Sequence, residues 1–334
     1  MGKLIMGLKD LSSLVTPNNI LATGGVRLVP DDSVTFIAEI VRPWGTVSDA
    51  EVGLLGVPFD GCVSYRPGTR FGPDSIRQAL KLGTTYSVAL DQDFSGLHLV
   101  DCGDVIASNV IKDMHDRVES VMSILFENRI FPLTIGGDHS ISYPCIRALS
   151  RKNRGTRVGV IDFDAHFDSR KALPGREHSG MWVEQIQSMD GLPVAAANIV
   201  QIGIGDFAYS REYRNSILNH GGSFYTPQDI RNKGLETVVD KAVEQATRGV
   251  EALYVTVDID CIQQAYAPGT SVPNPVGLSP WDLLAALDRI SVHPLFSGFD
   301  LVEVAPPLDI DGMTSRLGAE IIRRVLCGLS LRFR

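Results

Sequence analysis

The sequence lacks the features that mark disulfide-rich, membrane-spanning and secreted proteins. Its 334 residues include only 5 cysteines, which are dispersed and form no CxxC pair. Such a set indicates reduced thiols rather than a disulfide framework. No stretch approaches the roughly 18 uninterrupted apolar residues of a membrane span. The first 14 residues are interrupted by Gly7, Lys9 and Asp10 and make a poor signal peptide, so we expect a cytoplasmic protein without a membrane partner.

An excess of basic residues is also missing. The chain carries 31 Lys and Arg against 39 Asp and Glu, which gives a formal net charge of −8. This balance argues against a nucleic-acid-binding module, and an acidic pocket would favour cationic ligands. Because 44% of the residues are hydrophobic, the chain has enough apolar side chains for a large core. The composition indicates an enzyme or binding protein that acts on small molecules.

Neither an internal repeat nor a linker divides the chain, so we expect one domain over residues 51–334. Residues 1–50 are irregular, with prolines, glycines and asparagines that break any period. We expect them to form an extension packed on the body or on a neighbouring subunit.

Short apolar runs alternate with helix-like segments beyond residue 51. The apolar runs cover 52–59, 97–105, 131–137, 157–165, 198–205, 252–260 and 296–306. Runs of this kind, bounded by Gly, Pro or Asp, are typical of strands buried on both faces. The helix-like segments include 73–82, 114–127, 279–290 and 313–331. The alternation predicts an α/β protein in which a parallel sheet lies between two helix layers.

Acidic and histidine side chains gather where three of these runs end, and the carboxyl ends of parallel strands are where sites form. They are His139, Asp164, His166, Asp168, Asp258 and Asp260. Those that alternate by two share one face of an extended chain. Separately, such acids are ordinary turn or capping residues, and a lone histidine is usually a core residue. Together they suit two divalent ions bridged by carboxylates, and the absence of thiolate favours a Mn²⁺-like ion over structural zinc.

Three signatures resemble, in order, those of the ureohydrolase superfamily, which includes arginase and agmatinase. They are GGDHS at 136–140, DFDAHFD at 162–168 and VDID at 257–260. Residues 56–80 are similar to the agmatinase-like branch, and the whole resemblance spans about residues 50–331. It implies a single catalytic domain folded as a three-layer α/β/α sandwich around an eight-stranded parallel sheet. It also implies a homo-oligomer, either a trimer or a hexamer.

The same resemblance implies a dinuclear metal centre and a reaction. One ion would be held by His139, Asp164, Asp168 and Asp258, and the other by His166, Asp164, Asp258 and Asp260. The expected ions are Mn²⁺ or, as the alternative, Ni²⁺. Water between the ions would attack the carbon of a small cationic guanidine-type substrate bound by Glu303. Asp168 would pass a proton to the departing amine, and the products would be urea and an amine.

Several positions near the expected site depart from arginase and agmatinase. Ser179 stands where those enzymes have a histidine, and His178 is either a proton shuttle one residue early or a solvated loop residue. Arg170 replaces an asparagine that recognises the amino-acid end of arginine, whereas Asp206 matches an acidic position that helps hold the substrate amine. Trp182 either lines an apolar wall or begins a helix. Arginine is therefore disfavoured, and agmatine, guanidinobutyrate, guanidine, an alkylguanidine or a biguanide remain open as substrates.

Two other readings compete with a ureohydrolase. A catalytically silent or regulatory subunit, working with an active paralogue in a hetero-oligomer, is suggested only by Ser179 and by an unusual Gln263-Gln264 pair. It is disfavoured because all six ligand positions are kept. A deacetylase on a related sandwich fold would use a single zinc ion, and the bridging acids argue against it.

Overall fold

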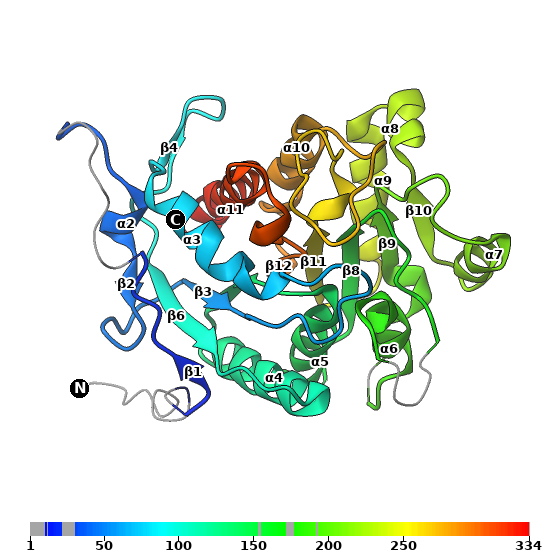
Figure 1. Ribbon diagram of the computed structural model, residues 1–334, viewed down its shortest axis with the longest axis horizontal. Coiled ribbons are helices and arrows are strands. Elements are labelled where there is room, and N and C mark those ends of the chain that lie inside the picture. Colours follow the sequence, from blue (N-terminus) through cyan, green and yellow to red (C-terminus); the bar gives the residue numbers. More distant parts are fainter. Residues whose placement is uncertain are drawn as a thin grey trace.

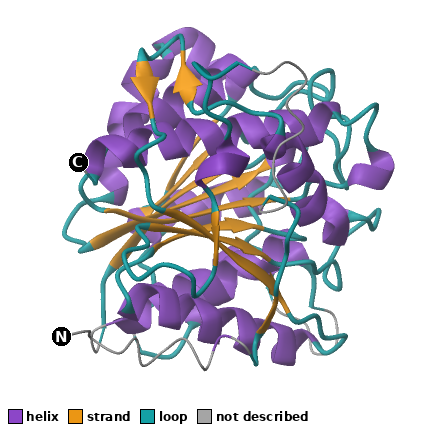
Figure 2. Ribbon diagram, turned by 90° about the vertical axis from the view of Figure 1, so that its left-hand side faces the viewer, coloured by secondary structure: helices purple, strands orange, loops and turns teal. Residues whose placement is uncertain are grey.

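The computed structural model describes residues 11, 13–21, 31–152, 155–171, 177–191 and 193–333. This part of the chain forms a ten-stranded sheet between two layers of helices (Figures 1 and 2). Eight strands run parallel to one another across it, from one edge to the other. They are β6 (Leu99–Val105), β3 (Val52–Gly56), β7 (Phe131–Ile135), β12 (Phe296–Val302), β11 (Ala252–Asp258), β8 (Val158–Phe163), β9 (Ile199–Ile202) and β10 (Ser223–Tyr225). The predicted sandwich around an eight-stranded parallel sheet is confirmed.

Helices cover the two faces of the sheet and enclose a hydrophobic core on each (Figure 2). One face carries α4 (Ile111–Glu127), α5 (Ser142–Arg151) and α6 (Trp182–Ser188). The other carries α3 (Gly72–Lys81), α8 (Pro227–Lys233), α9 (Leu235–Ala246), α10 (Pro280–Ile290) and α11 (Met313–Arg332). Alternate residues of a strand belong to opposite cores, as Leu54 and Leu55 of β3 do. Strands buried on both sides explain the nearly continuous apolar runs in the sequence.

Local sequence signals set several helix ends. The Ser279 hydroxyl accepts a hydrogen bond from the Asp282 amide at 3.2 Å, and the Asp282 carboxylate accepts one from the Ser279 amide at 3.1 Å. This capping box and Pro280 in the first turn start α10 where the sequence predicts a helix. The sequence did not predict the strand β10. Its three residues are only half-buried at the edge of the sheet, so they do not form the apolar run that marks the inner strands.

The first 50 residues add short elements to one edge of the sheet. β1 (Val15–Thr16) pairs antiparallel with β6, and β2 (Arg42–Pro43) pairs parallel with it. Leu21, Val41 and Ile37 of α2 (Ile37–Ile40) are buried in the core. Residues 1–10, 12 and 22–30 of the expected extension lie outside the described residues, and packing on a neighbouring subunit stays a prediction.

Three further elements lie at the periphery. They are β4 (Tyr86–Ser87), which pairs with β5 (Gln92–Asp93), and α7 (Arg211–Asn219), which precedes β10. Among the described helices, none has both the length and the apolar character needed to cross a membrane.

A buried ion pair joins α3 to the sheet. The Arg77 guanidinium, which is fully buried, donates to both Asp101 carboxylate oxygens at 2.9 Å and to Asp104 Oδ1 at 2.6 Å. Both acids lie on β6, so the contact fixes the helix against the edge of the parallel sheet. Removing one partner of such a pair leaves an uncompensated charge in the interior.

We therefore expect Arg77→Leu to lower the free energy of unfolding by about 3–5 kcal/mol, because Asp101 would stay buried without a counter-charge. Equilibrium denaturation in urea measures this loss. Arg157→Ala is the matched control, since the Arg157–Glu251 pair is exposed and should contribute less than about 1 kcal/mol. Equal effects of the two substitutions would contradict the assignment.

Candidate metal centre

All six side chains that the sequence singles out meet at the carboxyl edge of the sheet. They come from three strands: β7, β8 and β11. His139 lies in the turn that follows β7, and Asp258 is the last residue of β11. The loop after β8 supplies the alternating members of DFDAHFD, and Asp260 lies in the turn after β11. Parallel strands end at the same edge, which is why segments over 100 residues apart in the sequence converge.

One group forms around His139, whose ring is almost wholly buried. Its Nδ1 atom lies 3.2 Å from Asp164 Oδ2, 3.4 Å from Asp168 Oδ2 and 3.2 Å from Asp258 Oδ2. These are the four residues that the family resemblance assigns to one ion. They present one nitrogen and three carboxylate oxygens to a common space.

A second group forms around His166. Its Nδ1 atom lies 3.4 Å from Asp164 Oδ1 and 3.1 Å from Asp260 Oδ2. Asp164 therefore presents one oxygen to each histidine, as a bridging ligand must. Asp258 presents Oδ2 to His139, whereas its Oδ1 accepts a hydrogen bond from the Asp260 amide at 2.8 Å. The structure thus brings Asp258 to the first group directly and to the second through the backbone of Asp260.

The charges of this cluster are strongly perturbed. Burial and then the repulsion of neighbouring carboxylates raise the pKa of Asp164 and of Asp258. Burial alone would lower the pKa of His139, but the adjacent carboxylates, Asp164 first, outweigh it and raise that pKa well above its ordinary value. The pKa of His166 is likewise raised, since the attraction of Asp260 and Asp164 exceeds the effect of burial. The cluster therefore requires positive charge.

Buried atoms without a hydrogen bond show whether metal ions could supply this positive charge. His139 Nδ1 and Asp164 Oδ2 are buried and make no hydrogen bond, although they face each other within the first group. Leaving such groups unpaired costs about 1–3 kcal/mol each, whereas coordination of a cation satisfies them. The donors are imidazole nitrogen and carboxylate oxygen without thiolate, a set suited to borderline divalent ions. The residues present fit a dinuclear centre.

One acidic neighbour was missed in the sequence. Asp162, on β8, is fully buried and lies 3.9 Å from His139 Nε2, and its Oδ2 accepts from Gln201 Nε2 at 2.8 Å. Geometry alone groups it with His139 and Asp164 as a possible metal cluster. The signal was available, because Asp162 precedes Asp164 by two residues and continues the same alternation.

A cavity of about 200 Å³ opens onto the cluster. Four of the six ligands line it together with Glu303. The other polar side chains of its wall are the cation Arg170 and the hydroxyl-bearing Ser64, Ser179, Tyr209 and Ser271. The cavity is smaller than the roughly 300–1,000 Å³ of drug-sized sites, so it suits a small substrate. Ser64, Tyr209 and Ser271 were not predicted: Ser64 lies in the stretch 56–80 that resembles the agmatinase-like branch, but no chemical pattern singled out any of the three hydroxyls.

Glu303 occupies the buried end of this cavity. It follows β12 with φ of +64°, and Asp168 also has a positive φ of +43°. Non-glycine residues hold such conformations at a cost and cluster at functional sites. Glu303 Oε1 accepts from the His139 amide at 3.0 Å, whereas Oε2 is buried and unpaired. Burial, then the charge of Asp258, raises the pKa of Glu303 well above its ordinary value.

The other predicted site residues lie at different places. Arg170 and Ser179 line the cavity, and His178 is half-buried nearby with its Nδ1 accepting from the Gly180 amide at 3.1 Å. Trp182 does not reach the cavity, because it begins α6 and is fully buried with its ring centroid 4.9 Å from that of His139. Asp206 lines a separate cavity of about 490 Å³. Of the two readings of Trp182, the structure places it as the start of a helix.

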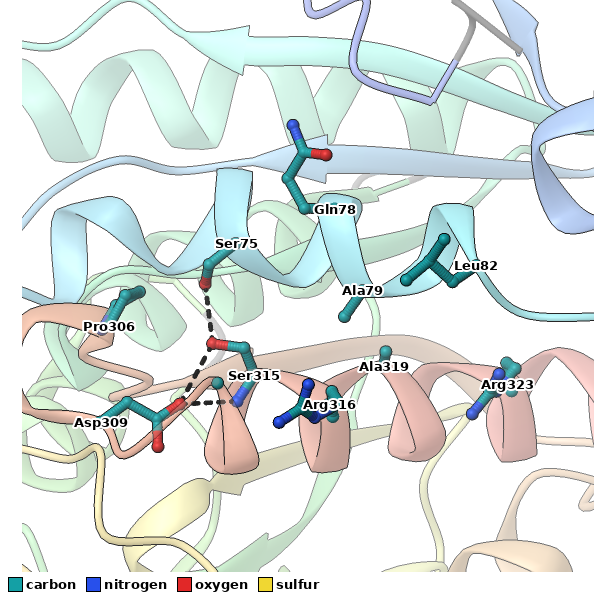
Figure 3. Close-up of a pocket in the computed structure, with 11 residues that line it drawn as sticks. Ser75, Gln78, Ala79, Leu82, Pro306, Asp309, Ser315, Arg316, Ala319 and Arg323 are labelled. Atoms are coloured by element: carbon teal, nitrogen blue, oxygen red, sulfur yellow. Dashed lines mark hydrogen bonds between the residues drawn. The ribbon is translucent and has the colours of Figure 1, made fainter. Parts of the chain in front are cut away.

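A larger cavity of about 560 Å³ lies between α3 and α11, away from the cluster (Figure 3). Figure 3 shows that its polar side chains bond to one another: the Ser75 and Ser315 hydroxyls are 3.0 Å apart, and Asp309 Oδ2 accepts from the Ser315 amide at 3.2 Å. Its lining lacks the clustered acids and histidines found at the carboxyl edge. The smaller cavity is therefore the candidate active site.

Comparison with known proteins agrees with this placement. The model of the Arginase family matches residues 50–328. A formimidoylglutamase of Halalkalibacterium halodurans is 37% identical over 305 residues, which are 90% of this chain and 94% of that protein. The crystal structure of formimidoylglutamase from Bacillus subtilis superposes with a TM-score of 0.85 at 31% identity, covering 92% of this chain and 95% of that one. Formiminoglutamase of Trypanosoma cruzi, solved with Mn²⁺, has a TM-score of 0.78 at 27% identity and covers 84% and 94%.

We expect chelation of divalent ions to lower the melting temperature and Mn²⁺ to restore it, because repulsion among the buried acids is relieved only by a cation. Saturation at about 1,000 times Kd would stabilise the fold by about 4 kcal/mol per site. Thermal unfolding with metal analysis measures both effects. Asp258→Ala should abolish the response, whereas Asp206→Ala, in the separate cavity, should keep it. Two bound equivalents in Asp258→Ala would contradict the ligand set.

Proposed function

Because the chain belongs to the Arginase family and is a hydrolase acting on amidino groups, we propose that its substrate is an amidine that carries a carboxylate. The first candidate is N-formimidoyl-L-glutamate. Water would add across the bond between the formimidoyl carbon and the glutamate nitrogen, giving glutamate and formamide. The runner-up is a guanidino acid such as guanidinobutyrate, from which the same cleavage would release urea and an amine.

The observation that carries this proposal is that one cavity is lined by a buried acid, Glu303, and by an exposed cation, Arg170. Glu303, only 4% exposed, offers an unpaired carboxylate oxygen at the buried end, where an amidinium would donate a charge-assisted hydrogen bond. Arg170 lines the same cavity but is exposed, and its guanidinium lies over the Tyr209 ring at 5.3 Å. A guanidinium held in this way is suited to bind a carboxylate with two hydrogen bonds. A substrate with a cationic head and an anionic tail matches both ends.

The same charges disfavour substrates with two cationic ends. The distal ammonium of agmatine would face Arg170, and the repulsion would not be relieved by Asp206, which lies outside this cavity. Arginine carries a carboxylate but also an ammonium at that end. We therefore place agmatine and arginine below the amidino acids.

Divalent ions, when bound by the two ligand groups, would supply an activated water at neutral pH and stabilise negative charge on the reacting centre. Glu303 would orient the amidinium so that its carbon faces the cluster. Asp168 Oδ1, which lies 3.5 Å from the Tyr209 hydroxyl at the cavity wall, is the oxygen placed to pass a proton to the departing nitrogen. We propose Mn²⁺ as the ion, since a relative is solved with it, and keep Ni²⁺ as the alternative. A shuttle role for His178, a trimer or hexamer and a cytoplasmic location stay predictions.

A substrate panel tests the proposal. Mn²⁺-loaded protein should hydrolyse N-formimidoyl-L-glutamate fastest, guanidinobutyrate more slowly, and agmatine, arginine and guanidine least, with formamide, urea and free amine measured separately. Glu303→Gln should retain both metals and lose turnover, because the neutral amide attracts the amidinium less. Agmatine as the fastest substrate would contradict the charge argument. No turnover of any compound with two bound metals would favour the silent subunit.

Arg170→Ala tests the carboxylate contact. Loss of a charged hydrogen bond, about 1.5–3 kcal/mol, should lower kcat/KM for N-formimidoyl-L-glutamate by about 10- to 100-fold and leave that for agmatine unchanged or higher. Arg211→Ala is the matched control, because Arg211 lines the neighbouring cavity instead. An equal loss for acidic and cationic substrates would show that Arg170 acts on the fold of the site rather than on the substrate.

A further inference from the structure

We propose that Thr256 and Asp300 are positioning residues that fix which ring nitrogen of His139 carries the proton, and so keep Nδ1 free for a metal ion. His139 Nε2 lies 3.0 Å from Thr256 Oγ1, and Thr256 Oγ1 donates to Asp300 Oδ1 at 2.5 Å. All three side chains are fully buried, so water does not compete for these contacts. The inference rests on the proposed metal centre and not on the choice of substrate.

Counting protons sets the direction of the hydrogen bonds from His139 through Thr256 to Asp300, which we call the relay. A hydroxyl has one proton to donate, and an ionised carboxylate only accepts. Because Thr256 gives its proton to Asp300, its oxygen must accept the proton of His139 Nε2. A histidine that coordinates a metal ion does so as neutral imidazole, which carries one proton, so in the metal-bound state Nδ1 would offer its lone pair. Nδ1 is the atom that faces three carboxylate oxygens and has no hydrogen bond.

Two further hydroxyls support this direction. Asp300 Oδ2 accepts from the Tyr254 hydroxyl at 2.8 Å, so both oxygens of Asp300 accept from hydroxyl donors. The Ser142 hydroxyl lies 3.3 Å from Thr256 Oγ1 and can donate to the remaining lone pair there. Among the described residues, no basic side chain forms an ion pair with Asp300. Both oxygens of Asp300 therefore accept from hydroxyl groups, and this directs the Thr256 proton away from His139.

The fold builds this network in register. Thr256 of β11 stands directly opposite Asp300 of β12, and Tyr254 stands opposite Gly298. A Cβ atom at Gly298 would lie 2.7 Å from the Tyr254 ring, so glycine there gives the ring its place beside Asp300. The arrangement sits behind His139, on the side away from the three carboxylates, and contributes no atom to the substrate cavity. It is a support for the ligand rather than part of the reacting site.

Metal affinity, measured apart from turnover, tests the proposal. Thr256→Val keeps the shape but removes the hydroxyl, and we expect the Kd of at least one Mn²⁺ to rise by about 10- to 100-fold, the usual effect of losing a partner behind a ligand. Thr256→Ser restores the hydroxyl and should bind within about threefold of the natural protein. Thr134→Val is the matched control and should also stay within about threefold, because Thr134 is a fully buried strand threonine whose hydroxyl contacts Met122 Sδ at 3.6 Å and not His139. Titration calorimetry of metal-free protein gives these constants.

The outcomes separate this proposal from the metal centre itself. A natural protein that binds no Mn²⁺ would remove the centre and the relay together. A natural protein that binds two ions, with Thr256→Val binding them equally well, would overturn the relay alone. Weak binding in both Thr256→Val and Thr256→Ser would also overturn it, since packing and not the hydroxyl would then be responsible. If Thr256→Val does not fold, Asp300→Asn should weaken Mn²⁺ binding in the same direction, and unchanged binding would overturn the relay.

Discussion

The crowding of carboxylates at one edge of the sheet is the constraint on which the rest of the site depends. Asp164, Asp168, Asp258 and Asp260 are nearly inaccessible to water, and each raises the cost of ionising its neighbours. Two histidines alone offer at most two positive charges to these four acids. Divalent ions meet the demand with the donors already in place, and the unpaired Nδ1 of His139 shows where one of them would bind.

This acidic cluster also determines what the cavity can accept. The buried end, closed by Glu303, favours the cationic head of an amidine, and it would reject an anionic group. We propose that selectivity among amidines arises at Arg170, the exposed cation of the cavity wall. Arg170 follows Asp168 by two residues on the loop after β8, so the exposed cation and three of the ligands share one loop and differ in burial.

The ligands could be predicted from the sequence because two regular rules apply to them. Residues that alternate by two on an extended chain share a face, and parallel strands end at one edge of the sheet. His139, Asp164 and Asp258 were found in this way, although they lie at the ends of three different strands. Side chains on irregular loops follow no such rule. Tyr209 was missed, and Trp182 was placed by the packing of α6 against the core rather than by any local pattern.

The strand residues that support the site follow a third rule, which the apolar runs conceal. In a sheet covered on both faces, a polar side chain inside a strand has to find a partner within the protein, because water is absent. Thr256 and Asp300 interrupt otherwise apolar strands, and each does find such partners. The chain of contacts leads from the interior of β12 through β11 to His139. A buried threonine or aspartate in such a strand therefore indicates, from sequence alone, where a polar network approaches the site, although the register that completes it is visible only in the fold.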